Sequence, residues 1–224
     1  MSSIALVQPV AEGEQFDQEK YVALEHAASK KSFLVERKGL MTYSKLARDL
    51  LENAGSDESI PLDNPHCTEE SIALFATWVN HHSNADSIVT RITYPLAPGD
   101  LSSIFASWDL AFIHEHLVPN GDMKMHKKLY LVAGVAVYLG VTILQELCCG
   151  YMAWHVRDAT EKSKTAGAPT PTAVVRSWFG HSGDFEDNEL KAIVQKFRWC
   201  RSVDYNQLEK ESSEAHDLVN KDRQ

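Results

Sequence analysis

Residues 129–148 read LYLVAGVAVYLGVTILQELC, and this apolar stretch decides the fold. Gly140 interrupts the run, and a glycine just past a helical pattern is typical of a helix end. Thr142 follows, with Gln145 three residues later, which matches a capping box at a helix start. We therefore predict two helices packed in a hydrophobic core, the first over roughly 124–139 and the second beginning at Thr142.

A membrane span is the alternative interpretation of the same run. A spanning helix requires roughly 20 apolar residues in succession. Here Gly134 and Gly140 lie inside the run, and Gln145 and Glu146 follow it. We therefore favour a pair of core helices, and we expect no membrane partner.

Three short strands are predicted in the first part of the chain. Residues 20–39 contain KYVALEH and SFLVERKG, which are rich in β-branched and aromatic residues with partial alternation. This pattern predicts two strands. SIPLDNP, residues 59–65, predicts a third short strand that runs into a turn.

Two amphipathic helices are predicted in the same part of the chain. The first spans 44–55 and places on one face Leu46, Leu50 and Leu51. The second spans 68–82 and begins after Thr68, a residue type favoured at the N-cap. It ends at His81 and His82, where a protonated imidazole would interact favourably with the helix dipole.

The remainder of the chain is predicted to be mostly helical. Residues 83–103 hold Ser, Asn, Asp, Pro and Gly, and they predict a long loop or insertion. A short helix is predicted over 105–113 and a turn over 119–122. A further helix is marked at its start and end by Thr170, Pro171 and Gly180. The last helix lies within DFEDNELKAIVQKFRWC, residues 184–200.

Strands early in the chain and helices later predict the α+β class, with a short three-stranded sheet. The expected organisation has four parts. They are a flexible N-terminus (1–18), a domain over 19–158 that includes the loop insertion at about 83–103, C-terminal helices over 169–200 and a polar tail over 201–224.

Charge and cysteine content exclude several classes of protein. The formal net charge is −9, and no cluster of Lys and Arg is present to bind a phosphate backbone, so we expect no nucleic-acid partner. The four cysteines form no CxxC pair, which argues against a zinc ribbon. With no secretory signal at the start, a reducing intracellular compartment is expected, cytoplasmic and nuclear.

No motif of a catalytic, metal or cofactor site meets its spacing rule. GHSGD, residues 180–184, resembles a nucleophile elbow, but Gly183 comes one residue too early. IHEHL, residues 113–117, lacks the His-Glu-x-x-His spacing of a metalloprotease helix, so a surface loop is the preferred interpretation. We therefore expect no cofactor, no metal and no enzymatic activity.

The C-terminal helices carry more large apolar residues than two short helices can bury between them. These residues are Val174, Val175, Trp178, Phe179, Phe185, Ile193, Phe197 and Trp199. Left exposed, they would exceed the apolar patch of a few hundred Å² that a monomer usually shows. A helix from a partner protein, laid across them, is the expected solution.

The chain resembles the S-phase kinase-associated protein family, the F-box-binding adaptors of SCF ubiquitin ligases, over most of residues 20–200. The matching segments occur in the same order. They are SIPLDNP with the helix ending in WVNHH, SWDLAFI, LYLVAGVAVYLGVTILQELC and TPTAVVRSWFGHSGDFEDNELKAIVQKFRWC with its final Trp-Cys. The resemblance implies a BTB/POZ-type fold followed by two C-terminal helices that bind an F-box.

The resemblance also implies two sets of site residues and two partners. F-box proteins would bind at Leu144, Cys148, Val174, Val175, Phe179, Phe185, Ile193, Phe197, Trp199 and Cys200. A cullin would bind at the turn between the two dense helices, at Val137, Tyr138 and Gly140. Self-association through the BTB-type face stays open.

Three hypotheses about function follow. The first is an adaptor subunit that bridges F-box proteins to a cullin. The second is a structural partner of F-box proteins without a cullin, for example in a chromosome-segregation complex. It is motivated by Val137 and Gly140, where the family usually has Asn and Asp. The third is a stand-alone enzyme that uses GHSGD or IHEHL.

Overall fold

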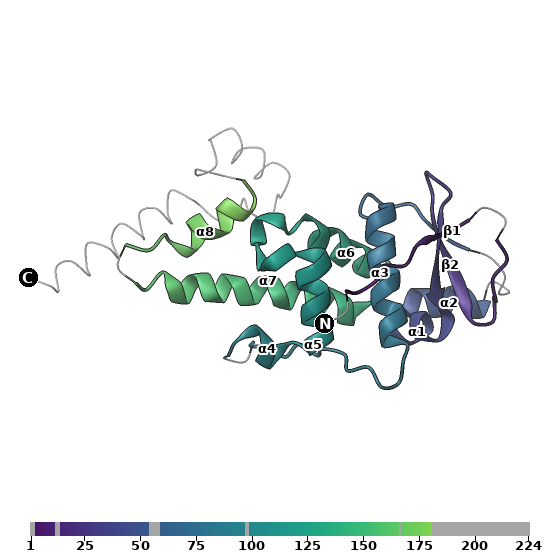
Figure 1. Ribbon diagram of the computed structural model, residues 1–224, viewed down its shortest axis with the longest axis horizontal. Helices are drawn as coiled ribbons and strands as arrows, with labels where there is room; N and C mark the ends of the chain where they lie inside the picture. Colours follow the sequence, from purple (N-terminus) through teal and green to yellow (C-terminus); the bar gives the residue numbers. More distant parts are fainter. Residues whose placement is uncertain (1–2, 12–13, 54–58, 97–98, 166, 181–224) are drawn as a thin grey trace, which may run out of the picture. The chain divides into compact units, whose positions relative to one another are not determined.

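A small sheet and a set of helices make up the fold (Figure 1). The computed structural model of the chain describes residues 3–11, 14–53, 59–96, 99–165 and 167–180. Residues up to Gly180 form one compact unit. Within this unit, the sheet with α1 and α2 lies at one end, α7 and α8 lie at the other, and α3 and α6 lie between them. The predicted α+β class is confirmed.

The sheet has four strands in the order β1-β3-β2-β4. The strands are β1 (Pro9–Val10), β2 (Tyr21–His26), β3 (Ser32–Glu36) and β4 (Ile60–Leu62). β3 pairs antiparallel with β1 and β2, whereas β4 pairs in parallel with β2. Leu24 lies opposite both Phe33 and Ile60, and all three side chains are buried. The sequence predicted the last three strands and missed β1.

Eight α-helices, one π-helical turn and two 3-10 turns are present over the described residues. They are α1 (Arg37–Tyr43), α2 (Lys45–Asn53), α3 (Glu69–His82), α4 (Leu101–Ile104), α5 (Ser107–Phe112), η1 (Ile113–Leu117), η2 (Pro119–Gly121), η3 (Met123–Met125), α6 (Lys127–Tyr138), α7 (Thr142–Lys162) and α8 (Pro171–Trp178). The second predicted strand ends at Glu36, and its last residues belong to α1.

α3 is the central helix of the core. The predicted N-cap is confirmed, because the Thr68 side chain accepts from the backbone N–H of Ser71, and the Ser71 side chain accepts from the backbone N–H of Thr68. Trp78 and Phe75 are fully buried. A side chain of this size contributes about 3 kcal/mol or more when it is fully buried in a well-packed core.

α6 and α7 form the pair of core helices that the sequence predicted. Gly140 has φ +67, so a residue without Cβ suits the turn between them. The predicted capping box at Thr142 is wrong. Val141, which is buried, occupies the N-cap position without a side-chain hydrogen bond, and Thr142 is the first residue of α7. No helix over the described ranges combines the length and apolarity that crossing a bilayer requires.

α6 lies so close to the segment before α3 that one of its positions has no room for a side chain. A Cβ placed on Gly134 would come within 2.3 Å of Cγ in the His66 ring. This glycine, which broke the apolar run in the sequence, therefore serves close packing. α6 also contacts α3.

A buried carboxylate joins α3, the segment after it, and α5. Asp109 is fully buried and accepts hydrogen bonds from Trp78 Nε1 (3.0 Å), His82 Nε2 (2.9 Å) and the Thr90 backbone N–H (2.8 Å). Burial by itself would raise the pKa of Asp109, but the hydrogen bonds from His82 and Thr90 outweigh it and hold the pKa below its usual value. His82 therefore belongs to this hydrogen-bond network. The network accounts for a histidine at this position without the predicted interaction with the helix dipole.

The segment IHEHL is wrongly predicted as a surface loop. It forms the π-helical turn η1, in which Ile113 and Leu117 are buried. Its polar side chains hold the start of the chain: Glu115 accepts from the Ile4 backbone N–H (3.1 Å), and His116 Nε2 contacts Ile4 O (2.9 Å).

Residues 3–10 make specific contacts, although the sequence predicted a flexible N-terminus. Besides the contacts of Ile4, the Val7 backbone N–H donates to Thr77 Oγ1 on α3 (2.9 Å). Pro9 and Val10 then pair with β3. We call residues 3–10 the N-terminal arm.

Replacing Asp109 with Asn should destabilise the protein by about 3 kcal/mol, because an amide group cannot accept from all three donors in a buried site. Urea unfolding followed by circular dichroism measures this change. The control is Asp86→Asn, which alters an exposed carboxylate and should change the free energy of unfolding by less than about 0.5 kcal/mol. Equal effects of the two substitutions would contradict the role of the network.

The same carboxylate should make stability depend on pH. Since the pKa of Asp109 is lower in the folded chain than in the unfolded one, its contribution is complete at neutral pH. The contribution is lost as the pH falls from about 3.9, the unfolded value, through the folded pKa. Between about pH 5 and pH 2.5, the free energy of unfolding should therefore fall more steeply for the unmodified chain than for Asp109→Asn. Parallel curves would contradict this assignment.

Candidate protein-interaction surfaces

α8 has the boundaries that the sequence predicted. The Thr170 side chain accepts from the Ala173 backbone N–H (3.2 Å), Pro171 is the first helical residue, and Gly180 follows the end with φ +72. Pro has no N–H to leave unpaired in the first turn, and Gly adopts positive φ without strain. The short helix is therefore defined by local signals at both ends.

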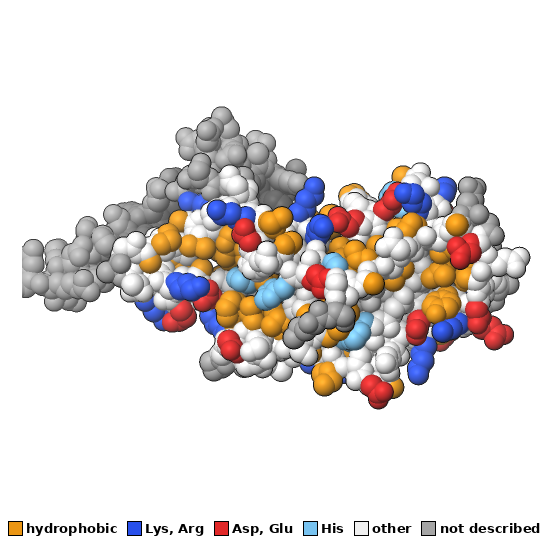
Figure 2. All heavy atoms as spheres, viewed as in Figure 1, with side chains coloured by type: hydrophobic (Ala, Val, Ile, Leu, Met, Phe, Trp, Pro, Cys, Tyr) orange, Lys and Arg blue, Asp and Glu red, His pale blue; other side chains and the backbone are white. Residues whose placement is uncertain are grey.

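The apolar residues of α8 are only partly covered. The Trp178 ring lies against the ring of His155 on α7, with centroids 6.3 Å apart. The Phe179 ring contacts the ring of His126, with centroids 4.6 Å apart. No residue of α8 is buried, and Phe179 is 49% exposed. We call Val174, Val175, Trp178 and Phe179 the α8 stripe. Figure 2 shows hydrophobic side chains gathered over the α7–α8 end of this face.

Two of the residues predicted to bind an F-box are buried in the core. Leu144 and Cys148 of α7 have no exposed surface and belong to the core. Burial raises the pKa of the Cys148 thiol, so it stays protonated and unreactive. In this conformation the two side chains expose no surface that a partner could touch.

The other predicted contacts of this group lie outside the described residues. They are Phe185, Ile193, Phe197, Trp199 and Cys200. Ser182, the serine of the GHSGD motif, also lies outside. For these positions the sequence-based prediction stands as it was made.

The predicted cullin site forms an exposed turn on a rigid base. Val137 is 57% exposed and Tyr138 37% exposed, while Leu139 is fully buried. The Ser44 hydroxyl donates to the Leu139 carbonyl oxygen, which fastens the turn to the start of α2. Gly140 adopts a positive φ in this turn between α6 and α7.

α2 carries two exposed leucines, the first of them next to this turn, and sequence reasoning missed both. A Cβ on Gly140 would lie 4.0 Å from the Leu46 backbone nitrogen, so Leu46 is next to the turn. Leu46 is 41% exposed and Leu50 42% exposed, whereas the buried residue of α2 is Ala47. The sequence had placed both leucines on the predicted apolar face of the helix. We call Leu46, Leu50, Val137 and Tyr138 the α2–α6 patch.

The two histidines and the glutamate of η1 do not converge on one site. His114 Nε2 bonds to the Tyr151 hydroxyl (3.0 Å), whereas Glu115 and His116 hold the N-terminal arm. Burial lowers the pKa of His114 and raises the pKa of Tyr151 to about 12. Within the ranges that the structure describes, no three His, Cys, Asp or Glu side chains lie together as metal ligands would.

A hydroxyl, an imidazole and a carboxylate lie within hydrogen-bond distance of one another, in that order, at the end of α3. Ser87 Oγ lies 3.2 Å from His82 Nδ1, and His82 Nε2 lies 2.9 Å from Asp109. The Ser87 hydroxyl, however, bonds to the Asn84 carbonyl oxygen (2.9 Å), and Asp109 also accepts from Trp78 and Thr90. These bonds make the group a structural support of the fold.

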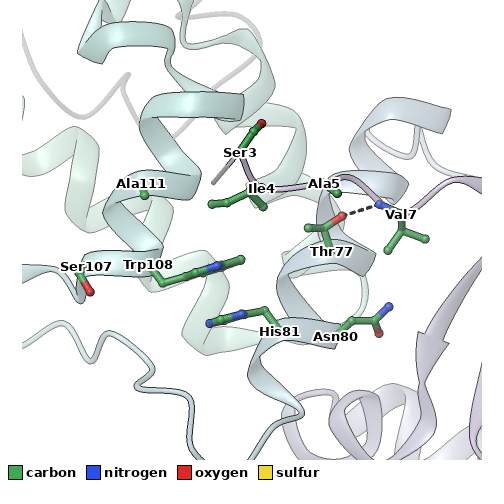
Figure 3. Close-up of a pocket in the computed structure, with 10 residues that line it drawn as sticks. All are labelled: Ser3, Ile4, Ala5, Val7, Thr77, Asn80, His81, Ser107, Trp108 and Ala111. Atoms are coloured by element: carbon green, nitrogen blue, oxygen red, sulfur yellow. Dashed lines mark hydrogen bonds between the residues drawn. The ribbon is translucent and has the colours of Figure 1, made fainter. Parts of the chain in front are cut away.

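A hollow lies between the N-terminal arm, α3 and α5 (Figure 3). Its volume is about 610 Å³. The His81 ring stacks on the Trp108 ring with centroids 3.7 Å apart, and Figure 3 shows both beside Ile4. Thr77 and Asn80 also line the hollow, but Thr77 accepts from the arm and Asn80 bonds to the backbone of β3. The polar groups of this wall therefore maintain the fold.

Comparison with known proteins shows a distant similarity. No protein-family model matches the chain. The chain is 22% identical to the S-phase kinase-associated protein 1 homolog of Tetrahymena thermophila over 160 aligned residues. The aligned region is 71% of this chain and 82% of that protein. The small sheet with several helices is compatible with a fold of that kind. The chain is therefore similar to this protein as a distant relative.

Proposed function

We propose that the chain is a non-enzymatic adaptor subunit of an SCF-type cullin-RING ubiquitin ligase. It binds F-box proteins through the α8 stripe and the residues that follow α8, and it bridges them to a cullin through the α2–α6 patch. The distant similarity to the S-phase kinase-associated protein 1 homolog supports an adaptor role. Such a role would be carried out in the cytoplasm and the nucleus.

The observation that carries this proposal is the incomplete burial of α8. The helix has a defined start and end and packs on α7, yet none of its residues is buried and Phe179 stays half exposed. If the α8 stripe stayed uncovered, this short helix would gain little stabilisation from burial of its apolar side chains. A partner helix laid along the stripe would bury it, which is the helix-in-groove mode of recognition.

A cullin would be bound by a separate surface. The α2–α6 patch offers four apolar side chains that are each more than a third exposed. Its base is fixed by the buried Leu139 and by the hydrogen bond from Ser44. A rigid base keeps the ordering cost of binding small.

Substitution of Phe179 with Asp should weaken binding of a purified F-box protein at least about 30-fold, because a carboxylate would replace a large apolar contact. Isothermal titration calorimetry on the full chain measures the change. Ile88→Asp is the control, since Ile88 is 77% exposed and lies outside the α8 stripe. Binding that survives in Phe179→Asp would place the F-box surface elsewhere.

The double substitution Leu46→Asp and Tyr138→Asp should weaken binding of a cullin to the preformed F-box complex at least about tenfold and leave F-box binding unchanged. Surface plasmon resonance with the immobilised complex measures both. If the unmodified complex binds F-box proteins but no cullin, the chain is instead a structural partner of F-box proteins.

A further inference from the structure

The turn η2 ends in the pair Asn120 and Gly121, and Asn-Gly is the dipeptide most prone to spontaneous deamidation. In such a pair the backbone nitrogen that follows Asn can attack the side-chain amide, and glycine has no Cβ to hinder the approach. Asn120 is exposed and has φ 54°, while Gly121 has φ 73°. Positive φ is uncommon for a residue other than glycine, so the conformation of Asn120 calls for attention.

The closed turn holds this pair in an unreactive geometry. The Gly121 N–H donates to the Val118 carbonyl oxygen (2.8 Å), which keeps the proton on the nitrogen. Asn120 has ψ 18°. Ring closure between the Gly121 nitrogen and Asn120 Cγ requires a strongly negative ψ, because only then do this nitrogen and the Asn120 Cβ lie on the same side of the Cα–C bond. The reaction must therefore wait until the turn opens.

η2 has few interactions that keep it closed. It is a single 3-10 turn, a conformation whose hydrogen bonds have poorer geometry than those of an α-helix. Its N-cap residue is Val118, whose side chain cannot accept a hydrogen bond. Apart from the bond of Gly121, the Asp122 backbone N–H donates to the Pro119 carbonyl oxygen (3.1 Å). Exposed turns of this kind open locally at a low cost in free energy, without unfolding of the core.

We propose that Asn120 is a site of spontaneous modification whose rate is set by the opening of η2. In the open turn, the Gly121 nitrogen loses its proton and forms a bond to Asn120 Cγ. The bond from Cγ to the amide nitrogen breaks, and ammonia leaves. Water then opens the cyclic imide at either carbonyl group, which gives aspartate or isoaspartate. No other reactant is required.

Isoaspartate at this position would alter the packing between η1 and α7. It routes the main chain through the former side chain, so the backbone of the turn becomes longer by one carbon atom. A Cβ on Gly121 would come within 3.7 Å of both the Tyr151 hydroxyl and His114 Nε2, so this backbone lies against both residues. The longer backbone should therefore disturb the hydrogen bond between His114 and Tyr151 (3.0 Å). This consequence does not depend on the proposed function.

The test is incubation of the full chain at neutral pH, in buffer and in urea, followed by peptide mapping with mass spectrometry. A protein-isoaspartate methyltransferase serves as the probe for isoaspartate. Asn120 should be modified in both conditions, at a rate at least about tenfold lower in the folded chain. Asn84 is the matched control, since it is also exposed but precedes Ala85, and it should be modified far more slowly than Asn120 in urea.

The variant Pro119→Ala shows whether the turn controls the rate. Proline restricts the open turn, so its removal should favour opening and raise the rate in the folded chain about threefold, with little change in urea. Equal rates in buffer and in urea, or equal rates for the folded original chain and the folded variant, would overturn control by η2. Absence of modification at Asn120 in the folded chain would overturn the site itself.

Discussion

The buried carboxylate of Asp109 is the constraint on which much of the helical half depends. A carboxylate without solvent must have its lone pairs satisfied, and here the donors come from α3 and from the segment that follows it. Trp78, His82 and Thr90 are thereby fixed relative to α5. The stacked pair of His81 and Trp108 follows from this arrangement, because each ring is the direct neighbour of a residue in the network.

The parts of the fold that the sequence predicted are those whose signals are local. Thr68 at the start of α3, and Thr170 with Pro171 at the start of α8, act on groups within four residues, so the pattern alone was sufficient. The capping box at Thr142 failed because burial of Val141, a tertiary effect, shifted the helix start. The turn η1 was missed because its polar residues hold the distant N-terminal arm.

The candidate site was predictable in outline and less so in detail. The α8 stripe could be recognised because its apolar side chains recur with helical spacing. The sequence could not show that Leu144 and Cys148 would be buried in the core, because their helical spacing is the same as that of surface residues. Leu46 was predicted on the apolar face of its helix but is largely exposed, because only the tertiary packing determines which face of α2 is covered.

The N-terminal arm has a consequence for how the protein is made. Its contacts join Val7 to a residue 70 positions later and Ile4 to residues more than 110 positions later. Contacts between such distant residues form late, because a long loop must first be closed. During synthesis, the arm can complete these contacts only after Thr77 and then η1 have been made.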